Sequence, residues 1–351
     1  MYSLYSWGAL PGSEGLCSFD PSCLSVQAYL QLSNSDWVLR QVNNTNISPT
    51  GCLPVLTAPG PAVESGLWRI IEFLKSEGHD LDAGLDKEQA AQATALVSMV
   101  RDGLVDALLF SWYLVPENFA QAIRPQLAKL FGFPLSLAIP TQLRDHAEQR
   151  LRANGTVDEA DDSGSEDTND DSQPGSLRSR LPRIYLLAKT GFNRHKDRSS
   201  HPVYRQADEY LAVLSRKLST KQYFFGDKAT TLDAVVYGHL SLLLRLDLPQ
   251  NPLKTAISQK YPNLRALCDR VHSRLEKPTA ISEPSLVAGT LSVAKQWLSS
   301  YTALPALPLG DAAEDPKRAE KIRSATGALF VFLGYVIYNG ILSAPATSHS
   351  A

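Results

Sequence analysis

Cysteines, metal-ligand pairs and N-terminal targeting signals are scarce or missing in this sequence of 351 residues. The four cysteines are too few and too irregularly spaced for a disulfide framework, and no CxxC or paired Cys/His spacing indicates a zinc site. We therefore predict reduced cysteines facing the cytosol and no metal. No lysine or arginine precedes Arg40, so the sequence offers neither the charged start of a signal peptide nor the arginines of a transit peptide.

Net charge is also small, because 34 basic residues nearly balance 36 acidic ones. A formal charge of −2 argues against nucleic acid as the main partner. The acidic residues are unevenly distributed, since Asp158 to Asp171 contains eight acids and no base. We predict that residues 154–181, which are rich in Gly, Ser, Asp and Glu, form a disordered loop inside a helical domain.

Charged side chains end at Arg323, and an apolar stretch follows. Residues 325–344 would form a helix of about 30 Å, which is the thickness of the hydrocarbon core of a membrane. Basic residues crowd its upstream side, which places the bulk of the chain in the cytosol. We predict a Pro-rich and basic linker at 301–323 and a transmembrane tail anchor at 324–344. The anchor's apolar residues are Ala325, Leu329, Phe330, Phe332, Val336, Ile337, Ile341 and Leu342.

The modest hydrophobicity, the glycines and the basic flank of this anchor favour the mitochondrial outer membrane over the secretory pathway. The alternative is a buried last helix of a soluble domain, although the Pro-rich stretch from Leu304 to Pro316 is more typical of a spacer.

Alternating strands and helices are predicted for residues 1–80. Strands are expected at 2–7 and 37–42, and helices at 21–32 and 65–77. Asp20 and Pro21 open the first helix as cap and first-turn residue. Pro54 enters an apolar strand, where proline belongs at an edge or in a turn, with a cis bond as one option. The order βαβ…βα predicts a thioredoxin-like domain.

The remaining soluble part, residues 81–300, has a helical period throughout. We expect an all-helical domain and find no internal repeat. The predicted helices span 87–114, 117–130, 141–152, 204–218, 232–246, 264–275 and 284–300.

One motif indicates the family more specifically than the helical spacing of apolar residues does. Phe224-Phe225-Gly226-Asp227 precedes Thr230 and Asp233, whose spacing at a helix start is that of a capping box. Together with the strand proline and with Glu64-Ser65 before a helix, it resembles the glutathione transferase superfamily. That resemblance implies a thioredoxin-like lobe and an all-α lobe.

Within that superfamily, FFGDKATTLDAVVYGHL, Tyr261-Pro262-Asn263-Leu264 and Asp20-Pro21-Ser22-Cys23-Leu24 resemble the metaxin family. The likeness is strongest to the larger metaxin-like subunit of the fungal mitochondrial sorting and assembly machinery. It implies a protein on the cytosolic face of the outer membrane that helps to assemble and release β-barrel precursors and supports protein import. The implied partners are a central β-barrel insertase, a second metaxin and the outer-membrane translocase.

A catalytic site is not predicted. Tyr5 and Ser6 lie near the position where a transferase activates the glutathione thiol, but the long loop after them leaves their register insecure. Asp20 stands where a redox relative has its attacking cysteine. The N-terminus of a helix would lower the pKa of Cys23, but a structural cysteine is the favoured interpretation.

Pro54, Glu64 and Ser65 are interpreted as vestigial glutathione-site positions, and His239 and Cys268 as core residues. We therefore expect no enzyme and no cofactor. A tail-anchored glutathione transferase is the alternative.

A basic band follows the acidic loop and offers a surface for an acidic partner or for anionic lipid. Its residues are Arg178, Arg180, Arg183, Arg194, Lys196 and Arg198. Neutralisation by the neighbouring acidic loop is the alternative.

Overall fold

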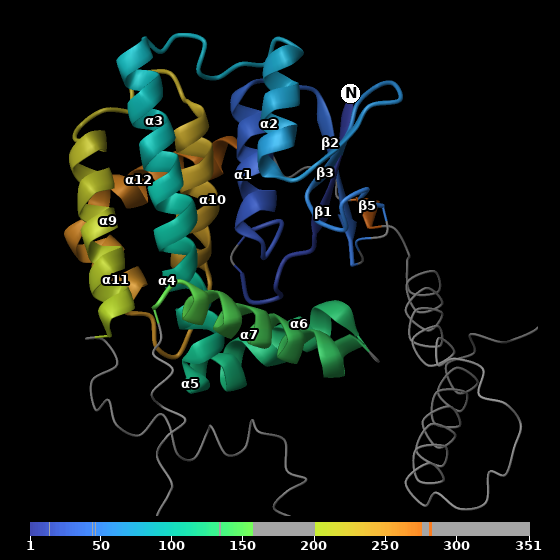
Figure 1. The fold of residues 1–351 in the computed structure, drawn as a ribbon, viewed down its shortest axis with the longest axis vertical. Helices are drawn as coiled ribbons and strands as arrows, with labels where there is room; N and C mark the ends of the chain where they lie inside the picture. Colours follow the sequence, from blue (N-terminus) through green and yellow to red (C-terminus); the bar gives the residue numbers. More distant parts are fainter. Residues whose placement is uncertain are drawn as a thin grey trace, which may run out of the picture. The chain divides into compact units, whose positions relative to one another are not determined.

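The computed structural model describes residues 1–13, 15–43, 45, 47–132, 135–156, 201–275 and, for the backbone alone, 281–282. By their contacts, residues Met1–Glu283 form one unit. Within it a mixed sheet and two helices form one lobe, and the remaining helices form the other (Figure 1). The predicted fold class, a thioredoxin-like lobe joined to a helical lobe, is confirmed for this part. The exact domain boundaries remain predictions.

The sheet has the strand order β4-β3-β1-β2-β5. Strand β1 pairs in parallel with β2, with Tyr2 opposite Trp37, and β3 runs antiparallel to both β1 and β4. The bounds are β1 Tyr2–Trp7, β2 Trp37–Val42, β3 Val55–Thr57, β4 Val63–Ser65 and β5 Ile281–Ser282. Strand β5 was not predicted; it arrives from beyond the last described helix and extends the edge of β2 at Arg40 and Gln41.

Helix α1 (Pro21–Leu32) connects β1 to β2 and is buried on nearly all sides. It is packed between the sheet and helix α10 (Thr231–Arg245), so both helices are apolar around most of their circumference. The two backbones approach closely at Gly238, where a Cβ would collide with the Pro21 carbonyl and the Ser25 side chain. This contact joins the two lobes. Helix α2 (Leu67–Ser76) completes the first lobe.

The long helix predicted at 87–114 is present, but its backbone is not uniform. It consists of α3 (Lys87–Met99), a π-helical turn (Val100–Leu104), α4 (Val105–Leu109) and a second π-helical turn (Phe110–Leu114). It ends at Val115, which is extended before Pro116 as the steric demand of proline requires.

The other helices predicted within the described part of the second lobe appear with shifted ends. Pro252, at the first turn, begins a helix that was not predicted, α11, whose N-cap Asn251 accepts from the Lys254 N–H at 2.9 Å. The remaining bounds are α5 Pro116–Asn118, a π-helical turn Phe119–Ile123, α6 Arg124–Phe131, α7 Leu135–Ala153, α9 Pro202–Leu218, α11 Pro252–Lys260 and α12 Pro262–Arg274.

Several predictions fall outside the described residues: nearly all of the acidic loop, the basic band, the helix at 284–300, the linker and the tail anchor. Within the described part of the chain, none of the helices combines the length and the apolar character that crossing a membrane requires.

Candidate functional site

The hydroxyl of Ser6, near the end of β1, is engaged inside the fold. Ser6 is fully buried; its hydroxyl donates to the Trp7 carbonyl at 3.0 Å and accepts from Nε2 of Gln27 at 3.3 Å. Tyr5 is half-buried, with the guanidinium of Arg40 6.0 Å from its ring centroid. Neither residue lines the cavity described below.

The N-terminus of α1 is closed by its own cap. A carboxylate oxygen of Asp20 accepts from the Cys23 N–H at 2.8 Å, as the sequence predicted. Cys23 is fully buried, and this burial, reinforced by the charge of Asp20, raises the pKa of its thiol well above the ordinary value. The lowering expected from a helix N-terminus is therefore overridden, and Cys23 is held as a thiol.

The strand proline and the Glu-Ser pair lie together at the start of α2. The Leu53-Pro54 peptide bond is cis, which was one of the predicted options, and the Pro54 carbonyl accepts from the Gly66 N–H at 2.8 Å. Ser65 is buried and its hydroxyl shares a hydrogen bond of 2.7 Å with Thr50. Glu64 pairs with Leu56 in the sheet. These contacts place Ser65 in an internal hydrogen bond; whether these positions retain any affinity for glutathione remains a prediction.

The predicted capping box at the start of α10 is present. One oxygen of Asp233 accepts from the N–H of Thr230 at 2.8 Å and from its hydroxyl at 2.7 Å, and the other accepts from the Phe224 N–H at 3.1 Å. Burial raises the pKa of Asp233 to about 6, although these hydrogen bonds oppose the shift. The carboxylate thus ties the aromatic-Gly-Asp turn to the helix.

A second carboxylate at this helix start escaped the sequence analysis. Asp82, in the connection between α2 and α3, accepts from the Thr231 N–H at 2.9 Å and from its hydroxyl at 2.6 Å. Lys75 of α2 pairs with it at 2.7 Å. Burial alone would raise the pKa of Asp82, but the bonds from Lys75 and Thr231 outweigh it and hold the value below the ordinary one. Asp82 joins the two lobes through hydrogen bonds.

His239 and Cys268 are buried, as predicted for core residues. Nδ1 of His239 lies 2.8 Å from the Val235 carbonyl, and burial lowers the pKa of its imidazole to about 4. The ring is therefore neutral and carries its proton on Nδ1. Cys268 is fully buried, and burial raises its pKa to about 12.

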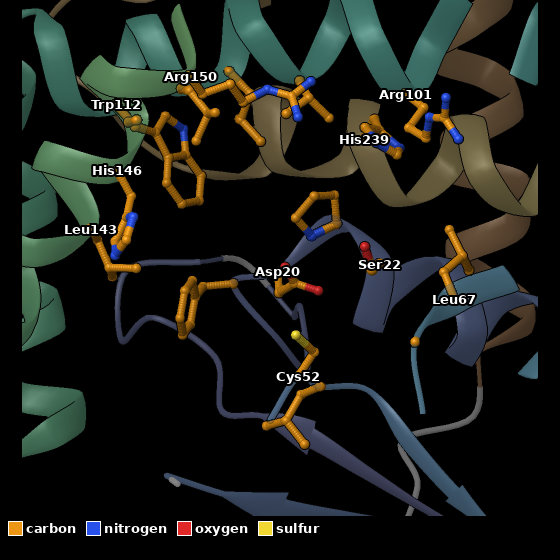
Figure 2. Close-up of a pocket in the computed structure, with 18 of the residues that line it drawn as sticks. Asp20, Ser22, Cys52, Leu67, Arg101, Trp112, Leu143, His146, Arg150 and His239 are labelled. Carbon is orange, nitrogen blue, oxygen red and sulfur yellow. The ribbon is translucent and has the colours of Figure 1, made fainter. Parts of the chain in front are cut away.

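A cavity of about 540 Å³ opens between the lobes, and the sequence analysis did not foresee it. Figure 2 shows Asp20, Ser22, Cys52 and Leu67 on the side of the first lobe, facing labelled side chains of the helical lobe. Its lining comprises Phe19, Asp20, Pro21, Ser22, Cys52, Leu53, Gly66, Leu67, Trp68, Arg101, Val105, Leu108, Leu109, Trp112, Tyr113, Leu143, His146, Ala147, Arg150, Val235 and His239.

Three of the N–H donors of the helical wall come from separate stretches of sequence, and His146 of α7 and His239 of α10 also line it. Arg101 and Trp112 belong to the two π-helical turns, and Arg150 to α7. Nε of Arg150 donates to Asp106 at 2.8 Å. No local motif marks these residues, although π-helical turns are frequent at functional sites. Among the described residues, no group of His, Cys, Asp and Glu is arranged to hold a metal ion.

Comparison with known proteins gives two family matches. Residues 23–144 match the family Tom37, described as "Outer mitochondrial membrane transport complex protein", and residues 207–271 match the C-terminal domain of glutathione S-transferase. The first match runs from α1 into α7, and the second from α9 into α12, so both lobes are represented.

Relatives extend along most of the chain. Metaxin-1 of Mus musculus is 26% identical over 346 residues, covering 98% of this chain and 92% of its own length. Metaxin-3 of Xenopus laevis is 27% identical over 274 residues, covering 78% and 76%. Among solved structures, glutathione transferase GSTFuA3 from Phanerochaete chrysosporium gives a TM-score of 0.47 at 14% identity, over 78% of this chain and 97% of that one. The resemblance to the transferase fold rests on the family match and the sheet topology.

Proposed function

Because this chain belongs to the metaxin family, we propose that it is a non-enzymatic component of the machinery that imports and sorts proteins at the mitochondrial outer membrane. The observation that carries this proposal is the match of residues 23–144 to a family described as an outer mitochondrial membrane transport complex protein. That match covers most of α1, α2 and the long helix that starts the helical lobe. The relatives add support because they align along nearly the whole chain.

The finer proposal is membership of the sorting and assembly machinery, as in the larger metaxin-like subunit of fungi. The protein would sit on the cytosolic face of the outer membrane, next to a central β-barrel insertase and a second metaxin-like subunit. It would favour the assembly and release of β-barrel precursors and would tether the outer-membrane translocase. A tail anchor at 324–344 serves this role because retention on a membrane raises the effective concentration of weakly binding neighbours.

We propose that the protein has no enzymatic activity, because the residues at the end of β1 and the start of α1 are already engaged in hydrogen bonds. A transferase must hold glutathione as a thiolate near the end of β1 and the start of α1. Here the Ser6 hydroxyl is engaged internally, and the Asp20 carboxylate already accepts from the Cys23 N–H in the first turn of α1. A second anion brought to this helix end would meet the Asp20 charge.

Affinity purification from mitochondria in mild detergent tests the proposed function. The full chain should recover a β-barrel membrane protein and a second metaxin-like chain in fixed ratio. A chain lacking residues 324–351 should recover less of both, because it has lost membrane retention. Recovery of neither partner with the full chain would contradict the proposal.

A glutathione conjugation assay separates the enzyme alternative. We expect no turnover above the uncatalysed rate. Turnover that disappears in Tyr5→Phe, Ser6→Ala or Cys23→Ala would establish a transferase instead. Carbonate extraction adds the test of the anchor, since a spanning tail keeps the protein in the membrane pellet.

A further inference from the structure

The cavity between the lobes has its negative and positive groups on opposite walls. On the first lobe, the carboxylate of Asp20 caps α1. On the helical lobe, Arg101, Trp112 and Arg150 bring N–H donors to the lining (Figure 2). A site for a thiolate would need its positive end at α1. The polarity here is the reverse, which favours a ligand whose anionic group lies against the helical lobe.

Trp112, in this wall, carries a buried donor, Nε1, without a hydrogen-bond partner in the described part of the chain. Its side chain lines the cavity and is only 2% exposed. Leaving a buried N–H without an acceptor costs about 1–3 kcal/mol. Native proteins rarely keep such a donor unless a ligand, an ion or water can accept from it.

Arg150 is held in place beside this donor. Its Nε donates to one oxygen of Asp106, and Asn154 donates to the other oxygen at 2.7 Å. Asp106 is buried, so the ion pair fixes the guanidinium against the cavity wall. Because Asp106 is bound through Nε, the Nη groups of Arg150 are available to a ligand. Arg101 adds a second guanidinium from the first π-helical turn; its side chain is half exposed and donates to Asp102 from Nε at 3.1 Å and from Nη2 at 3.4 Å.

The rest of the lining is largely apolar and comes from both lobes. Leu67 and Trp68 of α2 contribute from one side, and Leu108, Leu109 and Leu143 from the other. A volume of about 540 Å³ lies in the range of pockets that bury small molecules. Apolar walls with a few convergent donors at one side match a molecule that has a hydrocarbon body and one anionic end.

We propose that this cavity binds a small amphipathic carboxylate of the medium-chain fatty acid class. Its carboxylate lies on the wall formed by Arg101, Trp112 and Arg150, and its chain lies against the leucines of the two lobes. Binding would bridge the first lobe and the helical lobe next to their main contact, the packing of α1 on α10.

Calorimetric titration of decanoate tests this proposal. The full chain is held in phosphatidylcholine nanodiscs, with empty nanodiscs as the blank. We expect saturable binding at one site per chain. Decanol, which has the same chain and no charge, should bind at least about ten-fold more weakly, because a hydrogen bond to a charged group is worth about 1.5–3 kcal/mol. Glutathione should not compete.

Two variants locate the site. Arg101→Gln should weaken decanoate binding about ten-fold and leave decanol unchanged. Leu143→Trp fills the cavity and should weaken both ligands. Arg124→Gln is the matched control, since Arg124 is an exposed arginine of α6 that does not line the cavity. Unchanged thermal midpoints show that each variant is folded.

The proposal is wrong if decanoate binding does not saturate, if decanol binds as tightly as decanoate, or if Leu143→Trp leaves decanoate affinity unchanged. Displacement of decanoate by glutathione would also overturn it, because it would assign the cavity to a thiol tripeptide.

Discussion

The N-termini of α1 and α10 each have an aspartate in their cap, but the two aspartates differ in burial and in the number of hydrogen bonds that they accept. Asp233 is fully buried and accepts three hydrogen bonds from the turn and the cap of α10. Asp20 accepts from one amide of α1 and lines the cavity between the lobes. The carboxylate enclosed by the fold connects the turn to α10, whereas the one at α1 caps its helix and lines the cavity.

The two aspartates should contribute unequally to the free energy of unfolding, and we expect the largest loss for Asp233→Ala. This change leaves the Phe224 and Thr230 amides buried without an acceptor, so we expect a loss of about 4 kcal/mol in the free energy of unfolding. Urea unfolding of the full chain in mild detergent measures it. Asp247→Ala, which removes an exposed carboxylate paired with the exposed Lys254, is the control and should cost less than about 1 kcal/mol.

The pH dependence of stability sharpens the same contrast. Because the pKa of Asp233 rises from its ordinary value to about 6 on folding, the folded state binds the proton more tightly. The stabilisation is therefore complete below about pH 4 and is lost as the pH rises through about 6, by about 3 kcal/mol. Unfolding at a series of pH values, with Asp233→Asn as reference, isolates this effect. A difference that grows with pH would contradict it.

A smaller loss of stability is expected when Asp20, the cap of α1, is changed. Asp20→Ala removes one hydrogen bond to the Cys23 amide and should cost about 1 kcal/mol, the usual value of an N-cap. Asp20→Asn should cost less, since its side-chain oxygen still accepts. If Asp20→Ala destabilises the chain as much as Asp233→Ala, the contrast between the two caps fails.

The last prediction concerns the accessibility of the thiols in the native protein, which chemical labelling measures. Cys52 is exposed and should react with a maleimide within the mixing time of the experiment, while Cys23 and Cys268 should react only on unfolding. Mass spectrometry after digestion assigns each modified site. Rapid native labelling of Cys23 would show that the α1 end of the fold opens.

Local signals explain which elements could be predicted. Asp20-Pro21 and the Thr230/Asp233 pair mark helix starts in the sequence itself, and both helices begin there. The start of α11 carried a similar signal, Asn251-Pro252, that was overlooked. Strand β5 had no comparable signal, because a pairing of two residues with β2 depends on where the chain returns after α12.

The cavity could not be predicted, since its donors lie far apart in the sequence. Arg101, Trp112 and Arg150 line one cavity only because the end of the long helix packs against α7. The spacing of apolar residues also does not reveal the two π-helical turns that carry Arg101 and Trp112.

Most strands and helices, the caps of α1 and α10 and the family resemblance could be predicted from the residues, because these depend on neighbours a few positions away. The buried thiol of Cys23, the hydrogen bonds of Asp82 between the lobes and the cavity between them come from the packing of distant segments. Those properties depend on which distant side chains exclude water from a group, and desolvation outweighs the local pull of a helix end.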